Sequence, residues 1–286
     1  MDPSQQPATL ELAHHCIRPR MADDDLPEAL VQAGLRPELM PRHVAFVMDG
    51  NRRWAQARGL STAEGHAAGA QALNKIVDLS SSWRIRVITL FAFSQENFKR
   101  PEEEVNCVME LIEQAIRDNL DLCVREGIRM HVIGDPSRRP ASLQEAAREA
   151  EEMTKNNSRY HCIVATCYSG QWDIVQACRE LATKAQDKLI SPEDIDERML
   201  AGHLATSVLG EFTCPDLVIR TSGELRLSNF LLWQSAYSEL YFTNTLWPDF
   251  GEDEFIKALK DFQSRERRFG QRKSSQTVFE SVAGVV

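Results

Sequence analysis

Arginine-rich polar segments follow three of the short apolar runs in this chain, at the points where buried strands would end. They begin at Asp49, Ser94 and Arg220. In parallel α/β sheets, ligands bind outside the carboxyl ends of the strands. Arginine supplies a fork of donors suited to phosphate oxygens, and glycine lets backbone N–H groups approach an anion closely. The pattern therefore predicts an anion-binding site assembled from three strand ends.

A lone carboxylate, Asp49, stands among these anion-binding groups, directly before Gly50. A divalent cation explains it, because Mg²⁺ binds both carboxylate and phosphate oxygens. The segments therefore suggest that one or more diphosphates bind here with magnesium. A capped helix start with solvated arginines would explain any one segment, but it explains three of them poorly. No GxxxxGKS/T loop and no GxGxxG after a predicted strand occurs, so nucleotide kinase and dehydrogenase chemistry are disfavoured.

Two further polar features carry less information. His66 lies among glycines and alanines, where a histidine is more often a packing residue, although its place just after the first arginine-rich segment favours a role near the anion. The acidic triplet Asp23–Asp25 is followed by Leu26 and does not form a DDxxD motif, so it is interpreted as a solvated charge run.

Six short apolar runs, rich in β-branched and aromatic residues, predict strands that are buried on both faces. The runs are 44–48, 87–93, 130–133, 162–166, 217–219 and, more weakly, 240–242. Amphipathic segments predict helices over 65–83, 102–126, 142–155, 171–188, 192–206 and 253–267. This alternation favours an α/β layered fold with a mostly parallel sheet and right-handed crossovers.

The composition is that of a soluble globular protein, with 43% hydrophobic and 26% charged residues among 286. The net charge of −9 argues against a nucleic-acid partner, so local arginines must hold any bound anion. No apolar stretch reaches the roughly 20 residues that a membrane-spanning helix needs. The seven cysteines form no CxxC pair, which favours reduced thiols and disfavours a zinc site.

The two ends of the chain differ from its middle. Residues 1–41 are punctuated by prolines and predict a mostly irregular arm, whose composition leaves a targeting role open. Residues 273–286 predict a flexible tail. The compartment, either cytoplasm or plastid stroma, is therefore undecided at this point.

Several multi-residue motifs together resemble the cis-prenyltransferases, the family of undecaprenyl and dehydrodolichyl diphosphate synthases. The motifs, in chain order, are MDGNRRWA, FAFSQENFKRP, GDPSR, YSGQWDIV, RTSGELRLSN, LWPDF and RERRFG. The resemblance implies a single catalytic domain over 42–272, with a central six-stranded sheet flanked by helices around an apolar tunnel. It implies that isopentenyl diphosphate is added repeatedly to an allylic diphosphate such as farnesyl diphosphate, with Mg²⁺, and that each new double bond is cis.

The resemblance also implies roles for individual residues. Asp49 and Glu239 match the magnesium-linked carboxylates, and Asn97 matches an asparagine that assists proton removal. The matched substrate-binding residues are Gly50, Asn51, Arg52, Arg53, Trp54, His66, Ser94, Gln95, Glu96, Phe98, Arg100, Arg220, Arg226, Leu227 and Ser228. Thr62 stands where many members have arginine, so one phosphate contact is expected to be missing.

Product length depends on the depth of the implied tunnel. Ala92 is small and leaves the tunnel mouth open, whereas Tyr160, before the fourth strand, is a bulky candidate floor. No insertion is evident between Glu104 and Gly134, which argues against the very longest products. We expect a medium- to long-chain polyprenyl diphosphate, with a short-chain product as the alternative.

Two other readings compete with a self-sufficient enzyme. A non-catalytic subunit of a heteromeric enzyme is disfavoured because the motif from Asp49 to Arg53 is intact. The chain ends in VAGVV without the RxG of partner-dependent subunits, which favours a homodimer that contacts a membrane only peripherally, for product release. A phosphometabolite-binding module remains the second alternative, although it gives no reason for the long amphipathic segment 102–126.

Overall fold

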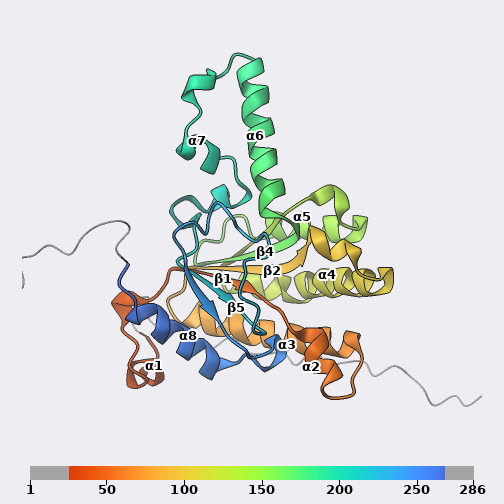
Figure 1. Ribbon diagram of the computed structural model, residues 1–286, viewed down its shortest axis with the longest axis vertical. Helices are drawn as coiled ribbons and strands as arrows, with labels where there is room; N and C mark the ends of the chain where they lie inside the picture. Colours follow the sequence, from red (N-terminus) through yellow and green to blue (C-terminus); the bar gives the residue numbers. More distant parts are fainter. Residues whose placement is uncertain (1–25, 268–286) are drawn as a thin grey trace, which may run out of the picture.

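The computed structural model describes residues 26–267, which form a six-stranded, entirely parallel sheet in the order β3-β4-β2-β1-β5-β6 (Figure 1). The strands are β1 (His43–Val47), β2 (Val87–Ser94), β3 (Ile128–Ile133), β4 (Tyr160–Tyr168), β5 (Leu217–Arg220) and β6 (Glu239–Phe242). All six predicted strands are therefore confirmed, and the mostly parallel prediction holds for every pair. Since β1 lies between β2 and β5, the three arginine-rich segments follow three adjacent strands.

The helices flank both faces of this sheet. The α-helices are α1 (Glu28–Gln32), α2 (Asn51–Gln56), α3 (Thr62–Ser82), α4 (Glu102–Arg125), α5 (Ala141–Met153), α6 (Gly170–Gln186), α7 (Glu197–Ala201) and α8 (Glu252–Ser264). The short 3₁₀ helices are η1 (Pro37–Leu39), η2 (Gln95–Lys99), η3 (Pro136–Arg138), η4 (Pro192–Asp194), η5 (Ala205–Phe212) and η6 (Trp247–Asp249). Ser61 and Glu64 close a capping box that fixes where α3 begins.

The larger core lies under α3, α4, α5 and α8 (Figure 1). Phe46 of β1 is fully buried there and makes edge-to-face contacts with Trp247 and Phe255, at ring-centroid distances of 5.9 and 5.5 Å. Each such side chain contributes roughly 1.5–3 kcal/mol by its burial. The aromatic cluster therefore anchors the strand that ends at Asp49.

The opposite face of the sheet carries a smaller core. Phe91 of β2 stacks on Phe230 at 4.4 Å, and Tyr168 of β4 meets both rings edge-on. Phe230 belongs to the loop that follows β5, so this stacking ties that loop to the sheet. Beyond this core, α6 extends away from the sheet with α7 beside it, forming a projecting arm (Figure 1).

Two parts of the sequence-based assignment are corrected. The prediction of one helix over 192–206 is wrong, because the segment forms η4 and the short α7, which starts at the cap Asp196 and stops at Gly202. Most residues from 192 to 201 are exposed, so no apolar face binds them into one helix. Part of the expected irregular arm is ordered: α1 and η1 form, and Leu26, Leu30 and Leu35 enter the larger core. The triplet Asp23–Asp25 and the tail 273–286 lie outside the described residues.

Acid should weaken the fold through His43 at the start of β1. Its ring is 1% exposed, with Nδ1 2.8 Å from the Phe212 carbonyl and Nε2 2.7 Å from the Thr89 hydroxyl. Burial lowers the pKa of His43 to about 4. Below about pH 6.5 the unfolded chain therefore binds a proton that the folded chain does not bind. The free energy of unfolding falls as pH drops from 6.5 towards 4. The loss is on the order of 3 kcal/mol.

Urea unfolding between pH 7.5 and pH 4.5 measures this effect. The variant His43→Gln should lose less stability over that range than the parent, and equal slopes would contradict the assignment. Burial also lowers the pKa of His131 to about 4, so part of the slope will remain in the variant.

Candidate active site

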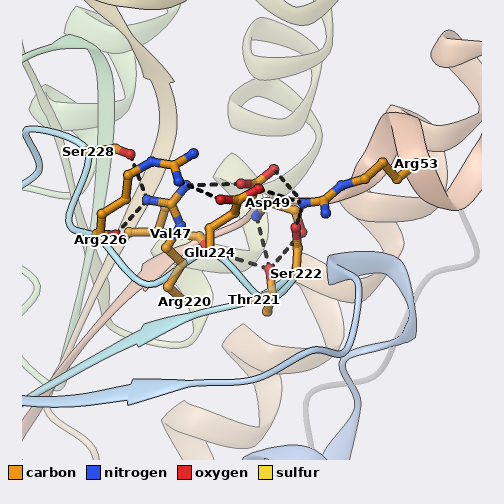
Figure 2. Close-up of polar contacts among 9 residues, drawn as sticks. All are labelled: Val47, Asp49, Arg53, Arg220, Thr221, Ser222, Glu224, Arg226 and Ser228. Atoms are coloured by element: carbon orange, nitrogen blue, oxygen red, sulfur yellow. Dashed lines mark hydrogen bonds and ion pairs between the residues drawn. The ribbon is translucent and has the colours of Figure 1, made fainter.

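Thr221, directly after β5, holds the end of β1 by hydrogen bonds. Its hydroxyl accepts the Asp49 backbone N–H at 3.0 Å and donates to the Asp49 carbonyl at 2.7 Å. These bonds join the turn after β1 to the turn after β5, and they leave the Asp49 carboxylate directed into the space between them (Figure 2). The carboxylate side chain is 37% exposed.

Arg220 is the buried centre of the site, with 4% of the residue exposed. Its Nη2 donates to Asp49 Oδ2 at 3.0 Å (Figure 2). Its Nη1 donates at 2.6 Å both to the Arg226 carbonyl and to the Ser228 hydroxyl. One guanidinium therefore shapes the loop after β5 and presents its cationic edge beside the carboxylate.

Glu224 lies between two arginines of the same cluster. Its Oε1 is 3.6 Å from Arg53 Nη2, and its Oε2 accepts from Arg226 Nη1 at 2.5 Å (Figure 2). Arg53 also donates to the Ser222 hydroxyl and lies 3.9 Å from Asp49 Oδ1. An anionic ligand that binds these arginines must compete with the Glu224 carboxylate.

Gly50 makes room for this arrangement. Its φ of 111° lies in the region that favours glycine, and an added Cβ would approach Leu246 Cδ2 to 2.9 Å and Ser222 Cβ to 3.1 Å. Asn51 continues into α2 and packs that helix on α3, because its Oδ1 would lie 2.3 Å from a Cβ at Gly69. The small residues of this region therefore allow close packing around the turn after β1.

The segment after β2 forms a second wall of the site. Ser94 and Asn97 close a capping box in which Asn97 Oδ1 accepts the Ser94 N–H at 3.0 Å. Phe98 meets Phe93 edge-on at 4.9 Å, and the Arg138 guanidinium lies 3.8 Å from the centroid of the Phe98 ring. Gln95 and Glu96 are the first two residues of η2 and lie between Ser94 and Asn97 in the chain.

His66 and Arg100 meet at a third carboxylate, Glu104 of α4. Arg100 Nη1 lies 3.2 Å from Glu104 Oε1, and His66 Nε2 lies 3.7 Å from the same oxygen. Burial, followed by the positive charge of Arg100, lowers the pKa of His66, although Glu104 opposes the shift. The imidazole is therefore suited to act as a neutral hydrogen-bonding group near pH 7.

The remaining expected site residues make their contacts with other parts of the fold. Trp54 donates from Nε1 to Asp249 at 2.7 Å, Arg52 is exposed on α2, and Leu227 packs on the smaller core. Glu239 is not brought to Asp49 within the chain, because it starts β6 while the site lies at the other end of the strands. There Glu239 accepts from Arg265 at 2.8 Å.

The site fits a magnesium ion that is shared with a ligand. No cluster of three or more histidine, cysteine or acidic side chains that could hold a metal occurs within 26–267. Mg²⁺ instead commonly keeps several waters and binds one or two carboxylates together with substrate phosphates. Asp49 provides such a carboxylate, because only one of its oxygens takes the Arg220 hydrogen bond and the other is 3.9 Å from Arg53.

Comparison with known proteins agrees with this geometry. Residues 47–270 match the Prenyltransf family model, described as undecaprenyl diphosphate synthase. A chloroplastic protein of Solanum lycopersicum, cis-prenyltransferase 4, is 53% identical over 252 residues, which cover 88% of this chain and 82% of that protein. A chloroplastic (2Z,6Z)-farnesyl diphosphate synthase of the same organism is 48% identical over 247 residues, covering 86% of this chain and 85% of that protein. Lavandulyl diphosphate synthase from Lavandula x intermedia, crystallised with dimethylallyl diphosphate, superposes with a TM-score of 0.79 at 41% identity, covering 82% of this chain and 100% of that one.

Proposed function

Because this chain belongs to the cis-prenyltransferase family, we propose that it adds isopentenyl diphosphate repeatedly to an allylic diphosphate such as farnesyl diphosphate, forming a cis double bond each time. The product is a medium- to long-chain cis-polyprenyl diphosphate. One observation carries the proposal: the buried Arg220 joins Asp49 to the loop that bears Arg226 and Ser228. This cluster surrounds one position with the groups that a diphosphate and a divalent cation require.

The arginines divide between the two substrates. Arg220, Arg226 and Ser228 hold the diphosphate of isopentenyl diphosphate on the loop after β5. Arg53 and the backbone at Gly50 hold the allylic diphosphate, with His66 as a further donor. In the absence of substrate, the contacts with Glu224 hold Arg53 and Arg226 in place. Glu224 gives up these contacts when the anions bind.

The reaction begins when the C–O bond of the allylic diphosphate breaks, giving a carbocation and a diphosphate anion. Asp49 would hold a magnesium ion here, and the bound ion would supply positive charge to stabilise the departing diphosphate. The arginines add fixed charge at the same position without having to reorganise. The double bond of isopentenyl diphosphate then attacks the cation, and a proton leaves the new adduct.

The proton that leaves the new adduct needs an acceptor. Asn97 is a poor base, because a neutral amide has little affinity for a proton and its Oδ1 already accepts the Ser94 N–H. We assign the proton to an oxygen of the departing diphosphate, with Asn97 orienting that group. We therefore expect Asn97→Ala to reduce turnover because the diphosphate is misplaced, although the base itself remains.

Purified chain tests the proposed function directly. Incubated with farnesyl diphosphate, radiolabelled isopentenyl diphosphate and Mg²⁺, it should form polyprenyl products, and EDTA should abolish them. Dimethylallyl diphosphate, which the structure of lavandulyl diphosphate synthase contains, is the second primer to compare. A chain that binds both diphosphates without forming a carbon–carbon bond would instead support the phosphometabolite-binding module.

Tyr160 is the proposed floor of the product tunnel. It lies at the amino end of β4, opposite the site, and is 1% exposed within the larger core. Ala92, near the site end of β2, packs against the same core. A prenyl chain that grows from the site into this core would therefore pass Ala92 first and reach Tyr160 last.

The variant Tyr160→Ala should shift the product distribution to longer chains, by one or more isoprene units. Removal of the ring leaves space that the growing chain can fill. Reversed-phase chromatography of the dephosphorylated products measures the shift. Tyr160→Phe keeps the bulk and should leave the distribution unchanged, and unchanged lengths in Tyr160→Ala would exclude this residue as the floor.

A second copy of the chain is the proposed partner of the projecting arm. An open groove of about 570 Å³ lies between α6 and α7, and its lining includes Leu181, Ile195, Leu200 and Trp233. Val175 of α6 is 46% exposed, so the outside of the arm is also apolar in part. Light scattering should give twice the monomer mass.

The chloroplastic relatives favour the plastid stroma as the compartment. In the part of the chain that the structure describes, no helix has both the length and the apolar character needed to cross a bilayer. We propose that the enzyme meets a membrane only peripherally, when the polyprenyl product leaves. Fusion of residues 1–41 to a fluorescent protein tests whether this segment directs import.

A further inference from the structure

Asn229 joins three parts of the site that are distant in the sequence. Its Nδ2 donates to Glu96 Oε1 at 2.9 Å and to the Ser169 hydroxyl at 2.6 Å. Its Oδ1 accepts the backbone N–H of Gln171 at 2.9 Å, and its carbonyl accepts that of Gly170 at 2.7 Å. One residue therefore links the loop after β5, the wall formed by η2, and the start of α6.

The orientation of this amide is fixed by its partners. A backbone N–H can only donate, so the atom that faces Gln171 must be the oxygen. The NH₂ group then points at Glu96, whose carboxylate can only accept at neutral pH. Asparagine is thus the residue type that satisfies both sides, whereas an isosteric aspartate would satisfy Gln171 and oppose Glu96.

The surroundings hold Asn229 in place. Gly170 approaches so closely that an added Cβ would lie 3.0 Å from the Asn229 carbonyl and 2.9 Å from Leu232 Cγ. The backbone of Asn229 is left-handed, with a φ of 64°, as is that of Ser228 before it, with a φ of 48°. Asparagine tolerates this conformation better than most residues. The loop that carries Ser228 is therefore pressed against α6 in one conformation.

We propose that Asn229 is a positioning residue that holds the isopentenyl diphosphate loop, with Arg226 and Ser228, at a fixed separation from Glu96 on the opposite wall. The inference rests on the proposed function, because it concerns the same site. Catalysis depends on the geometry of the two bound substrates, and a displacement of about 1 Å can cost 100-fold in rate. The hydrogen bond from Asn229 to Glu96 fixes that geometry across the crevice.

The isosteric variant Asn229→Asp tests this inference. At pH 8 it places a carboxylate against Glu96, and we expect kcat/KM for isopentenyl diphosphate to fall by about tenfold. The deficit relative to the parent should shrink as pH falls to 6, because like charges raise the pKa of one carboxyl and protonation restores a donor. Asn156→Asp adds the same charge at an exposed position and serves as the control.

A double-mutant cycle separates positioning from general damage to the fold. In a Glu96→Gln background, which has its own loss of activity, Asn229→Asp should cost less than twofold, because glutamine donates to the new carboxylate. Equal losses in both backgrounds, or an active parent with an unaffected Asn229→Asp, would overturn the inference alone. An inactive parent would overturn the proposed function as well, so the two failures are distinguishable.

Discussion

Replacing Asp49 with asparagine is expected to lower kcat by about 10³-fold, which corresponds to roughly 4 kcal/mol in the activation barrier. Asparagine keeps the shape of the side chain, and the Thr221 bonds involve only the Asp49 backbone, so the latch between the two strand ends survives. What disappears is the negative charge with which Asp49, in the proposed mechanism, would hold Mg²⁺ next to the leaving diphosphate. The variant also leaves the positive charge of Arg220 uncompensated, which strengthens anion binding in the ground state.

The experiment separates binding from chemistry. Single-turnover rates at saturating Mg²⁺ and both substrates give the effect on the chemical step, and equilibrium dialysis of isopentenyl diphosphate gives the effect on binding. We expect slow chemistry with binding that is retained. Asp187→Asn, at the exposed C-cap of α6, is the matched control. A rate within tenfold of the parent at saturating Mg²⁺ would show that another group holds the metal.

The sheet could be predicted from the sequence because strands buried on both faces leave an unambiguous signal. Runs such as 87–93 contain a single polar residue, Thr89, and the polar segment that follows must lie at a strand end. Adjacency of β1, β2 and β5 then brings three such ends together, which the local sequence cannot show on its own. The prediction of one shared site came instead from the general rule that ligands bind outside the carboxyl ends of parallel strands.

Contacts between segments that are distant in the chain could not be predicted from the sequence. Glu224 belongs to the RTSGELR motif, but its position between Arg53 and Arg226 depends on how the loop folds over β1. Asn229 follows a predicted site residue and has partners 58 to 133 positions away in the chain. Short helices were missed for a related reason: α1 and α2 span only five and six residues, so packing stabilises them more than any periodic pattern.

Replacing Arg220 with methionine should lower kcat/KM for isopentenyl diphosphate by about 10³-fold without unfolding the protein. The guanidinium supplies three hydrogen bonds from a nearly buried position, and removal of even one such donor from a preorganised site commonly costs 10²–10³ in rate. Its stabilising effect on the fold is smaller, because burying a charge offsets most of what the ion pair gains. The partner left behind, Asp49, has a side chain that is 37% exposed and can be solvated.

The free energy of unfolding should therefore change by no more than about 2 kcal/mol in Arg220→Met, while the enzyme becomes almost inactive. Arg220→Lys provides the matched comparison. It keeps the charge but cannot bond Asp49, the Arg226 carbonyl and Ser228 from one planar group, so we expect an intermediate loss of about 10²-fold. Thermal unfolding measured beside kinetics distinguishes the two contributions: parallel losses of stability and activity would make Arg220 a structural residue, whereas activity lost from a stable protein makes it part of the diphosphate site.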